Sequence, residues 1–185
     1  MGATVALMAQ QGLDVVLCDL TNGEPTPHGT PETRAREAAS AAEVLGVRRV
    51  TLTLPNRELR DTLEARRMLA EVIRDERPRW LFGPFAADAH PDHVAASAVC
   101  EAARFLAKLT KTDMRGEPHY PAKLYRYLAV HLRLLAKPSF IVDVSGQLDR
   151  KLAALACYRS QFEVNPANRG ILEAMRTSAA GWARS

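Results

Sequence analysis

Short apolar runs alternate with longer amphipathic runs along this chain, and this alternation most constrains its fold. Residues 14–20, 47–54 and 80–83 are short and apolar, which is typical of buried strands. The stretches between them have helical patterns. Strands that alternate with helices of about ten to fifteen residues form βαβ units. The sequence therefore predicts an α/β fold with a mostly parallel sheet.

The two helices between these strands have recognisable ends and faces. Thr30 caps the first, Pro31 fits its first turn, and Gly46 ends it. One face of this helix is expected to carry its small apolar side chains, Ala35, Ala38, Ala39, Ala42 and Leu45. The second helix, which Pro78 ends, has an apolar stripe of Ala65, Met68, Leu69, Val72 and Ile73. Its other face is expected to carry Arg66, Arg67, Glu71, Arg74 and Asp75.

The rest of the chain continues the same pattern. We expect a helix from about residue 94 to 108, strands at 123–130 and 139–144, and a helix at 147–162. No repeat, low-complexity segment or linker divides the chain, so we expect a single domain over residues 1–185.

Composition narrows the classes of partner. The chain has 185 residues, of which 47% are hydrophobic and 25% charged, as in a soluble globular protein. It has no membrane-spanning run and no signal peptide, and Cys18, Cys100 and Cys157 are widely spaced. We therefore expect reduced cysteines, a cytoplasmic location and no membrane partner.

The net charge of +4 brings nucleic acid into consideration. However, basic residues are interleaved with acids, as in residues 74–77 (Arg-Asp-Glu-Arg), and no block of Lys and Arg occurs. A solvated basic surface without a nucleic-acid partner is the better interpretation.

A polar segment rich in histidine follows the apolar run at 80–83. Residues 88–93 read Asp-Ala-His-Pro-Asp-His, and they fall at the carboxyl end of a predicted strand, where parallel sheets bind ligands. His90 and His93 are candidate zinc ligands, or one ligates while the other faces the substrate. Asp92 could fix the tautomer of either ring. The alternative is a polar turn in which Asp92 caps the next helix.

These residues resemble the second motif of the PIG-L/LmbE-like zinc N-deacetylases. Residues 19–24 and 29–34 are similar to the strand, loop and helix after the family's first motif, and residues 158–162 to its late helix. The resemblance extends over about residues 1–182 and is strongest to the subgroup that deacetylates the N-acetylglucosaminyl-malate precursor of bacillithiol. It implies a Rossmann-like α/β fold with helices on both faces of the sheet.

The resemblance also implies a reaction, hydrolysis of the N-acetyl group of an N-acetylglucosamine (GlcNAc) conjugate. His93 would be a ligand of Zn²⁺ or another divalent metal. His90 would stabilise the oxyanion or protonate the leaving amine, and Asp92 would orient it. Arg34 and His131 would bind the substrate. We also expect a homo-oligomer.

One motif of the family is missing. Its first motif, His-Pro-Asp-Asp, supplies two zinc ligands and the general base, and this sequence contains no such run. Residues 1–4 resemble the stretch that follows it, so we expect a fold truncated at both ends. His93 alone cannot hold a catalytic zinc, for which three protein ligands are expected. Two functions stay open: an N-deacetylase, or a catalytically impaired or metal-free relative that binds a sugar conjugate.

Overall fold

The computed structural model describes residues 1–128, 138–168 and 170–182, which form two compact units. Unit 1 contains residues 1–51 and 138–185, and unit 2 contains residues 52–137. In the described ranges, no helix is both long and apolar enough to cross a membrane.

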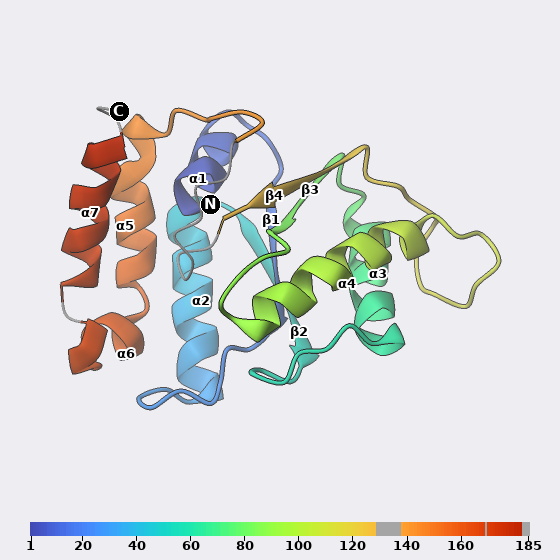
Figure 1. Cartoon of the computed structure of the whole chain (residues 1–185), viewed down its shortest axis with the longest axis horizontal. Coiled ribbons are helices and arrows are strands. Elements are labelled where there is room, and N and C mark those ends of the chain that lie inside the picture. Colours follow the sequence, from blue (N-terminus) through green and yellow to red (C-terminus); the bar gives the residue numbers. More distant parts are fainter. Residues whose placement is uncertain (129–137, 169, 183–185) are drawn as a thin grey trace. The chain divides into compact units, whose positions relative to one another are not determined.

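Unit 1 combines a two-stranded sheet with a group of helices (Figure 1). Its first part holds α1 (Gly2–Gln10), β1 (Val16–Thr21), α2 (Pro31–Leu45) and the start of β2 (Arg48–Leu54), which pairs with β1. Its second part holds α5 (Leu148–Ala156), α6 (Arg159–Phe162) and α7 (Ile171–Trp182), with 3₁₀ turns at Ser145–Gln147 and Pro166–Asn168. Helix α5 packs against α1, α2 and α7.

The core of unit 1 lies where α1, α2 and α5 meet. Its buried members are small or aliphatic side chains, Val5, Ala6, Ala41, Leu45 and Ala154. The partly buried side chains that pack against them include Leu17 of β1 and Tyr158. Small residues let the helices approach closely, so the second part of the chain completes the core begun by the first.

Unit 2 is a βαβ unit preceded by a helix. It holds α3 (Leu63–Glu76), β3 (Trp80–Pro84), α4 (Pro91–Ala107) and β4 (Lys123–Tyr127). Strands β3 and β4 are parallel, in a register that pairs Trp80 with Lys123 and Pro84 with Tyr127. Helix α4 packs on β3 and on α3. Parallel pairing across a helical connection confirms the predicted α/β class.

The predicted ends of α2 are confirmed, and its predicted buried face is confirmed in part. The hydroxyl of Thr30 accepts the Thr33 N–H at 3.2 Å, and Gly46 ends the helix at φ 73°. Ala42 and Leu45 are buried as predicted, whereas Ala35 and Ala39 are exposed. Glu37 and Ala41 are also buried. The buried Glu37 carboxylate accepts hydrogen bonds from Ser160 of α6.

Arg74 was predicted on the exposed face of α3, and this prediction is wrong: it is only 3% exposed. Its guanidinium donates to four backbone carbonyls, those of Ala107, Leu109, Met114 and Gly116. These acceptors satisfy the donors of a buried cation. Gly116, at φ 80°, leaves room for this arrangement, since a Cβ there would lie 2.8 Å from the Arg74 Cβ.

Two predictions for the C-terminal part are wrong. The described residues of the apolar segment 139–144 form no strand, and Phe140 and Ile141 are 55% and 85% exposed. The predicted helix at 147–162 is two helices, α5 and α6, separated at Cys157 and Tyr158. The backbone of Tyr158, with ψ 63°, leaves the helical region there.

Candidate active site

The His-Pro-Asp-His motif lies between β3 and the first turn of α4. His90 precedes Pro91, the first residue of α4, and its ring Nδ1 accepts the backbone N–H of Asp92 at 3.2 Å. Proline suits the first helical position, whose N–H has no partner within the helix. The cap is therefore His90 and not Asp92, and α4 begins three residues before the predicted start at Val94.

The hydrogen bond from Asp92 also fixes the protonation of the His90 ring. An Nδ1 that accepts a hydrogen bond carries no proton. A neutral His90 therefore has its proton on Nε2, and this N–H can donate to a developing negative charge or to a leaving group.

Asp88 holds both halves of the motif. Its Oδ1 accepts the backbone N–H of His90 at 2.7 Å, and its Oδ2 lies 3.0 Å from Nδ1 of His93. The Asp88 side chain is only 4% exposed. A carboxylate only accepts hydrogen bonds, so the His93 Nδ1 is the donor, and the neutral ring has its lone pair on Nε2. A histidine held in this way is typical of metal ligands.

Asp92 contacts His90 through its backbone and not through its carboxylate. The carboxylate is buried, and its Oδ2 accepts the backbone N–H of Arg57 at 2.6 Å. Arg57 has a φ of 68°, in the left-handed region. The contact found between Asp92 and His90 thus runs from the Asp92 N–H to the ring. The catalytic role of Asp92 stays a prediction.

Arg34, the predicted substrate-binding residue, lies in unit 1 near the start of α2. Its guanidinium carbon is 5.2 Å from the centre of the Tyr158 ring. A Cβ at Gly23, whose φ is 74°, would lie 3.0 Å from the Arg34 Nε. Within the described ranges, the half-buried Arg34 forms no ion pair. It is a positioned cation, suited to bind an anionic or hydroxyl group.

Arg49 and Asp19 lie beside Tyr158. Arg49 binds Asp19 through two nitrogens, with Nε–Oδ2 and Nη2–Oδ1 distances of 2.5 and 2.9 Å. Burial raises the pKa of the Tyr158 phenol above its ordinary value, and the Asp19 carboxylate adds to this effect. Tyr158 therefore presents a neutral ring to Arg34 at neutral pH.

A chain of polar contacts holds α6 in place, and the sequence predicts no role for the two carboxylates in this chain, Glu37 and Glu24. Both carboxylate oxygens of Glu37 accept hydrogen bonds from Ser160, one from its backbone N–H and one from its hydroxyl, each at 2.7 Å. The Gln161 amide donates to the Thr26 hydroxyl at 3.1 Å, and Thr26 donates to the buried Glu24. The signals in the sequence are the family-like segments 19–24, which contains Glu24, and 158–162, which contains Ser160 and Gln161.

The remaining predicted residues concern the substrate and the metal. His131 lies outside the described residues. Within the described part of the chain, no three His, Cys, Asp or Glu residues gather as a metal-binding group. His93 has a tautomer that suits zinc, but these residues do not make a complete zinc site. We assign no catalytic step to a metal.

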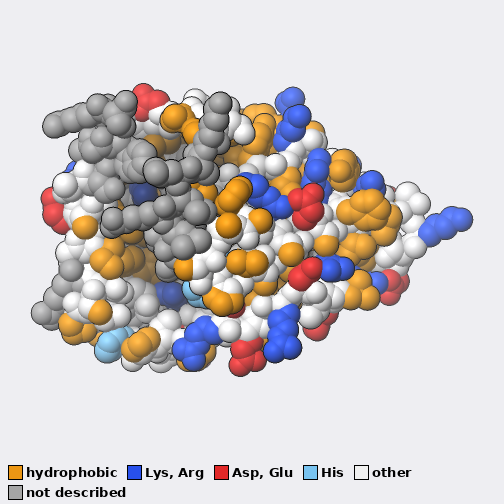
Figure 2. Space-filling model, in the orientation of Figure 1, with side chains coloured by type: hydrophobic (Ala, Val, Ile, Leu, Met, Phe, Trp, Pro, Cys, Tyr) orange, Lys and Arg blue, Asp and Glu red, His pale blue; other side chains and the backbone are white. Residues whose placement is uncertain are grey.

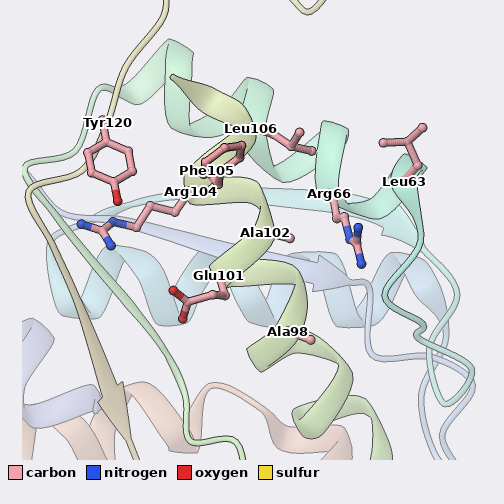
Figure 3. A pocket seen from close by; sticks show the side chains of 9 residues that line it. All are labelled: Leu63, Arg66, Ala98, Glu101, Ala102, Arg104, Phe105, Leu106 and Tyr120. Atoms are coloured by element: carbon pink, nitrogen blue, oxygen red, sulfur yellow. The ribbon is translucent and has the colours of Figure 1, made fainter. Parts of the chain in front are cut away.

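Unit 2 also contains a hollow of about 530 Å³ beside α4 (Figure 3). No residue of the His-Pro-Asp-His motif lines it; its lining is Leu63, Arg66, Ala98, Glu101, Ala102, Arg104, Phe105, Leu106 and Tyr120. Glu101 is paired with Arg126 at 2.6 Å, and Arg104 donates to the Pro121 carbonyl and lies over the Tyr120 ring. The charged groups of the hollow thus have partners already, and we assign it no catalytic role.

Figure 2 shows how charge is distributed on one face of the molecule. Lys and Arg side chains are interspersed with acidic and hydrophobic ones on that face. Several basic residues are also paired, such as Arg66 with Asp61 and Arg115 with Asp75. The charges seen on that face are thus of mixed sign, and the absence of a nucleic-acid partner stays a prediction.

Comparison with known proteins places these observations in a family. Residues 1–104 match the family model described as "PIG-L: GlcNAc-PI de-N-acetylase". A diacetylchitobiose deacetylase from Thermococcus kodakarensis is 32% identical over 88% of this chain, which spans 64% of that enzyme's length. A 1D-myo-inositol 2-acetamido-2-deoxy-alpha-D-glucopyranoside deacetylase from Catenulispora acidiphila is 27% identical over 90% of this chain and 76% of its own.

A solved structure is similar over nearly the whole chain. The conserved protein TT1542 from Thermus thermophilus superposes with a TM-score of 0.87 and 40% identity, covering 99% of this chain and 81% of that one. The fold agrees with the predicted LmbE-like α/β architecture, and the match to the family model includes the whole His-Pro-Asp-His motif. This chain belongs to the PIG-L family of de-N-acetylases.

Proposed function

We propose that this protein is a metal-dependent N-deacetylase that hydrolyses the acetamido group of a GlcNAc-type conjugate, for example N-acetylglucosaminyl-malate. The family and the two deacetylase relatives support amide hydrolysis. The name of the second relative describes a 2-acetamido-2-deoxy-glucopyranoside as its substrate.

The observation that carries the proposal is the different bonding of two neighbouring histidines. The Nδ1 of His90 accepts a backbone N–H, whereas the Nδ1 of His93 faces the Asp88 carboxylate. His90 therefore offers an Nε2–H donor, which suits the oxyanion of a tetrahedral intermediate or the departing amine. His93 offers an Nε2 lone pair, which suits Zn²⁺ or another divalent metal. His90 would therefore donate a hydrogen bond to the reacting group, and His93 would bind the metal.

Arg34 supplies the proposed contact to the rest of the substrate. Its guanidinium is held by the Tyr158 ring and makes no ion pair with the described residues. A conjugate with carboxylates, such as a malate group, would pair with such a cation in two hydrogen bonds. This contact favours an acidic conjugate over a neutral one.

A second candidate function is binding of the sugar conjugate without hydrolysis. The observation that favours it is that the described residues bring no three metal donors together. The binder would use the same Arg34 and Tyr158 but would need no metal.

One experiment separates the two functions. The purified chain is incubated with N-acetylglucosaminyl-malate and zinc, and free acetate is followed by proton NMR while binding is measured by calorimetry. A deacetylase releases acetate and loses this release with His90→Ala. Binding without acetate release, unchanged by His90→Ala, would establish the binder instead.

A further inference from the structure

We infer that Asp88 is a positioning residue that sets the ring tautomer of His93 while holding the backbone of His90. The inference deepens the proposed function and rests on it for the meaning of that tautomer. The test below needs neither metal nor activity.

The geometry gives the two carboxylate oxygens of Asp88 separate tasks. Oδ1 accepts the His90 N–H at 2.7 Å, and Oδ2 lies 3.0 Å from the His93 Nδ1. The side chain is 4% exposed, so water competes little for these bonds. The first contact fixes the loop just before α4, and the second fixes a ring in the first turn of α4.

Asp92, the other carboxylate of the motif, is engaged elsewhere. Its Oδ2 accepts the Arg57 N–H, and its link to the His90 ring is through its backbone. Asp88 therefore controls the His93 ring, while the Asp92 backbone controls the His90 ring. The two histidines receive opposite tautomers from two different residues.

Replacing Asp88 by asparagine makes this control testable, because the two side chains have nearly the same shape. Asparagine has one acceptor oxygen and one donor NH₂ group. The His90 backbone N–H can only donate, so the asparagine oxygen must face it. The NH₂ group then faces the His93 Nδ1, which must become an acceptor. Asp88→Asn should therefore move the proton of His93 from Nδ1 to Nε2.

The experiment is a long-range ¹H–¹⁵N correlation spectrum of the metal-free chain, labelled with ¹⁵N-histidine. It is recorded at about pH 8, above the pKa of about 6.5 of an unperturbed histidine. A His93→Gln variant assigns the His93 signals, and His90→Gln assigns those of His90.

The expected result is a reversal confined to one ring. In the unmodified chain, His93 should have a protonated Nδ1 and an unprotonated Nε2; Asp88→Asn should exchange them. His90 should keep its Nε2 proton in both proteins, and a circular dichroism spectrum like that of the unmodified chain reports that the variant remains folded. Asp61→Asn, which alters an exposed partner of Arg66, is the matched control and should leave both rings unchanged.

Two results would overturn the inference. One is an Nε2-protonated His93 in the unmodified chain. This measurement does not depend on whether any variant folds. The other is a folded Asp88→Asn protein in which His93 keeps its Nδ1 proton. If the reversal is seen but no acetate is released from the conjugate, the role of Asp88 stands and the proposed function fails.

Discussion

The imidazole rings of His90 and His93 are stacked, with centroids 4.8 Å apart and an angle of 21° between their planes. Their Nδ1 atoms nevertheless face a backbone N–H and a carboxylate, respectively. We predict that His93→Ala lowers the affinity of the chain for zinc about tenfold or more. His90→Ala should leave this affinity within about threefold of the original and remove acetate release. Competition with a chromophoric zinc chelator measures both. Equal loss of affinity in the two variants would mean that both rings bind the metal.

Arg34→Ala should lower kcat/KM for the acetylated conjugate by about 10²-fold, a typical cost of losing one positioned donor to the transition state. Arg36→Ala is the matched control, because Arg36 is an exposed arginine on the same helix. It should have near-normal kinetics. An Arg34→Ala enzyme as active as the Arg36→Ala enzyme would show that Arg34 is an ordinary surface residue.

Glu37→Ala should lower the free energy of unfolding by roughly 3 kcal/mol. The variant loses two hydrogen bonds from Ser160 to a buried carboxylate and leaves the donors without acceptors. Glu43→Ala, an exposed glutamate on the same helix, should change stability by less than about 0.5 kcal/mol. Urea unfolding of the three proteins tests this. Similar midpoints for the two variants would contradict the anchoring role of Glu37.

Cys100 should be the least reactive thiol of the three. Burial raises its pKa to about 11, so at pH 8 it remains a protonated and weakly nucleophilic thiol. Cys18 and Cys157 are partly exposed and should react first with a disulfide reagent. Rapid labelling of Cys100 in the folded protein at about pH 8 would contradict the predicted order of thiol reactivity.

The raised pKa of Cys100 also predicts that the stability of the protein falls as the pH rises from about 9 to about 11, because the Cys100 thiol ionises at a lower pH in the unfolded chain than in the folded one.

Arg57→Gly should stabilise the protein by about 0.5 kcal/mol or more. The left-handed φ of 68° strains an arginine by roughly 1–3 kcal/mol, and glycine relieves this strain at an entropic cost of about 0.4–1 kcal/mol. Arg60→Gly is the control: Arg60 has no positive φ, so glycine should be destabilising there. Thermal unfolding compares the two. A lower Tm for Arg57→Gly would mean that the arginine side chain contributes more than the strain costs.

The elements that the sequence predicts well are those whose signals are local. Thr30, Pro31 and Gly46 act on their own helix, so the ends of α2 could be placed from neighbouring residues alone. The segment 139–144 has the composition of a strand, but a strand also needs a partner, and composition does not report one. The sequence does not indicate the burial of Arg74, for a related reason. Its acceptors are backbone carbonyls 33 to 42 residues away, and any sequence has carbonyls.

The candidate site, too, can be predicted from the sequence only where its signals are local. The spacing of His90 and His93 marked the motif, and residue type alone made both possible ligands. Which nitrogen carries the proton depends on Asp88 and on the Asp92 N–H, and these contacts exist only once α4 begins at Pro91. The sequence does not indicate the burial of Glu37, because a glutamate in a helix is usually exposed and its partner, Ser160, lies 123 residues further along the chain.

The way in which Arg74 holds residues 107–116 has a consequence for how this segment can change over evolution. Because Arg74 binds carbonyl oxygens, most side chains there can be exchanged without loss of its contacts. An insertion or deletion would instead move a carbonyl away and leave a buried cation without an acceptor. Among relatives that retain this arginine, we expect the segment to vary in sequence and keep its length, with a glycine at position 116.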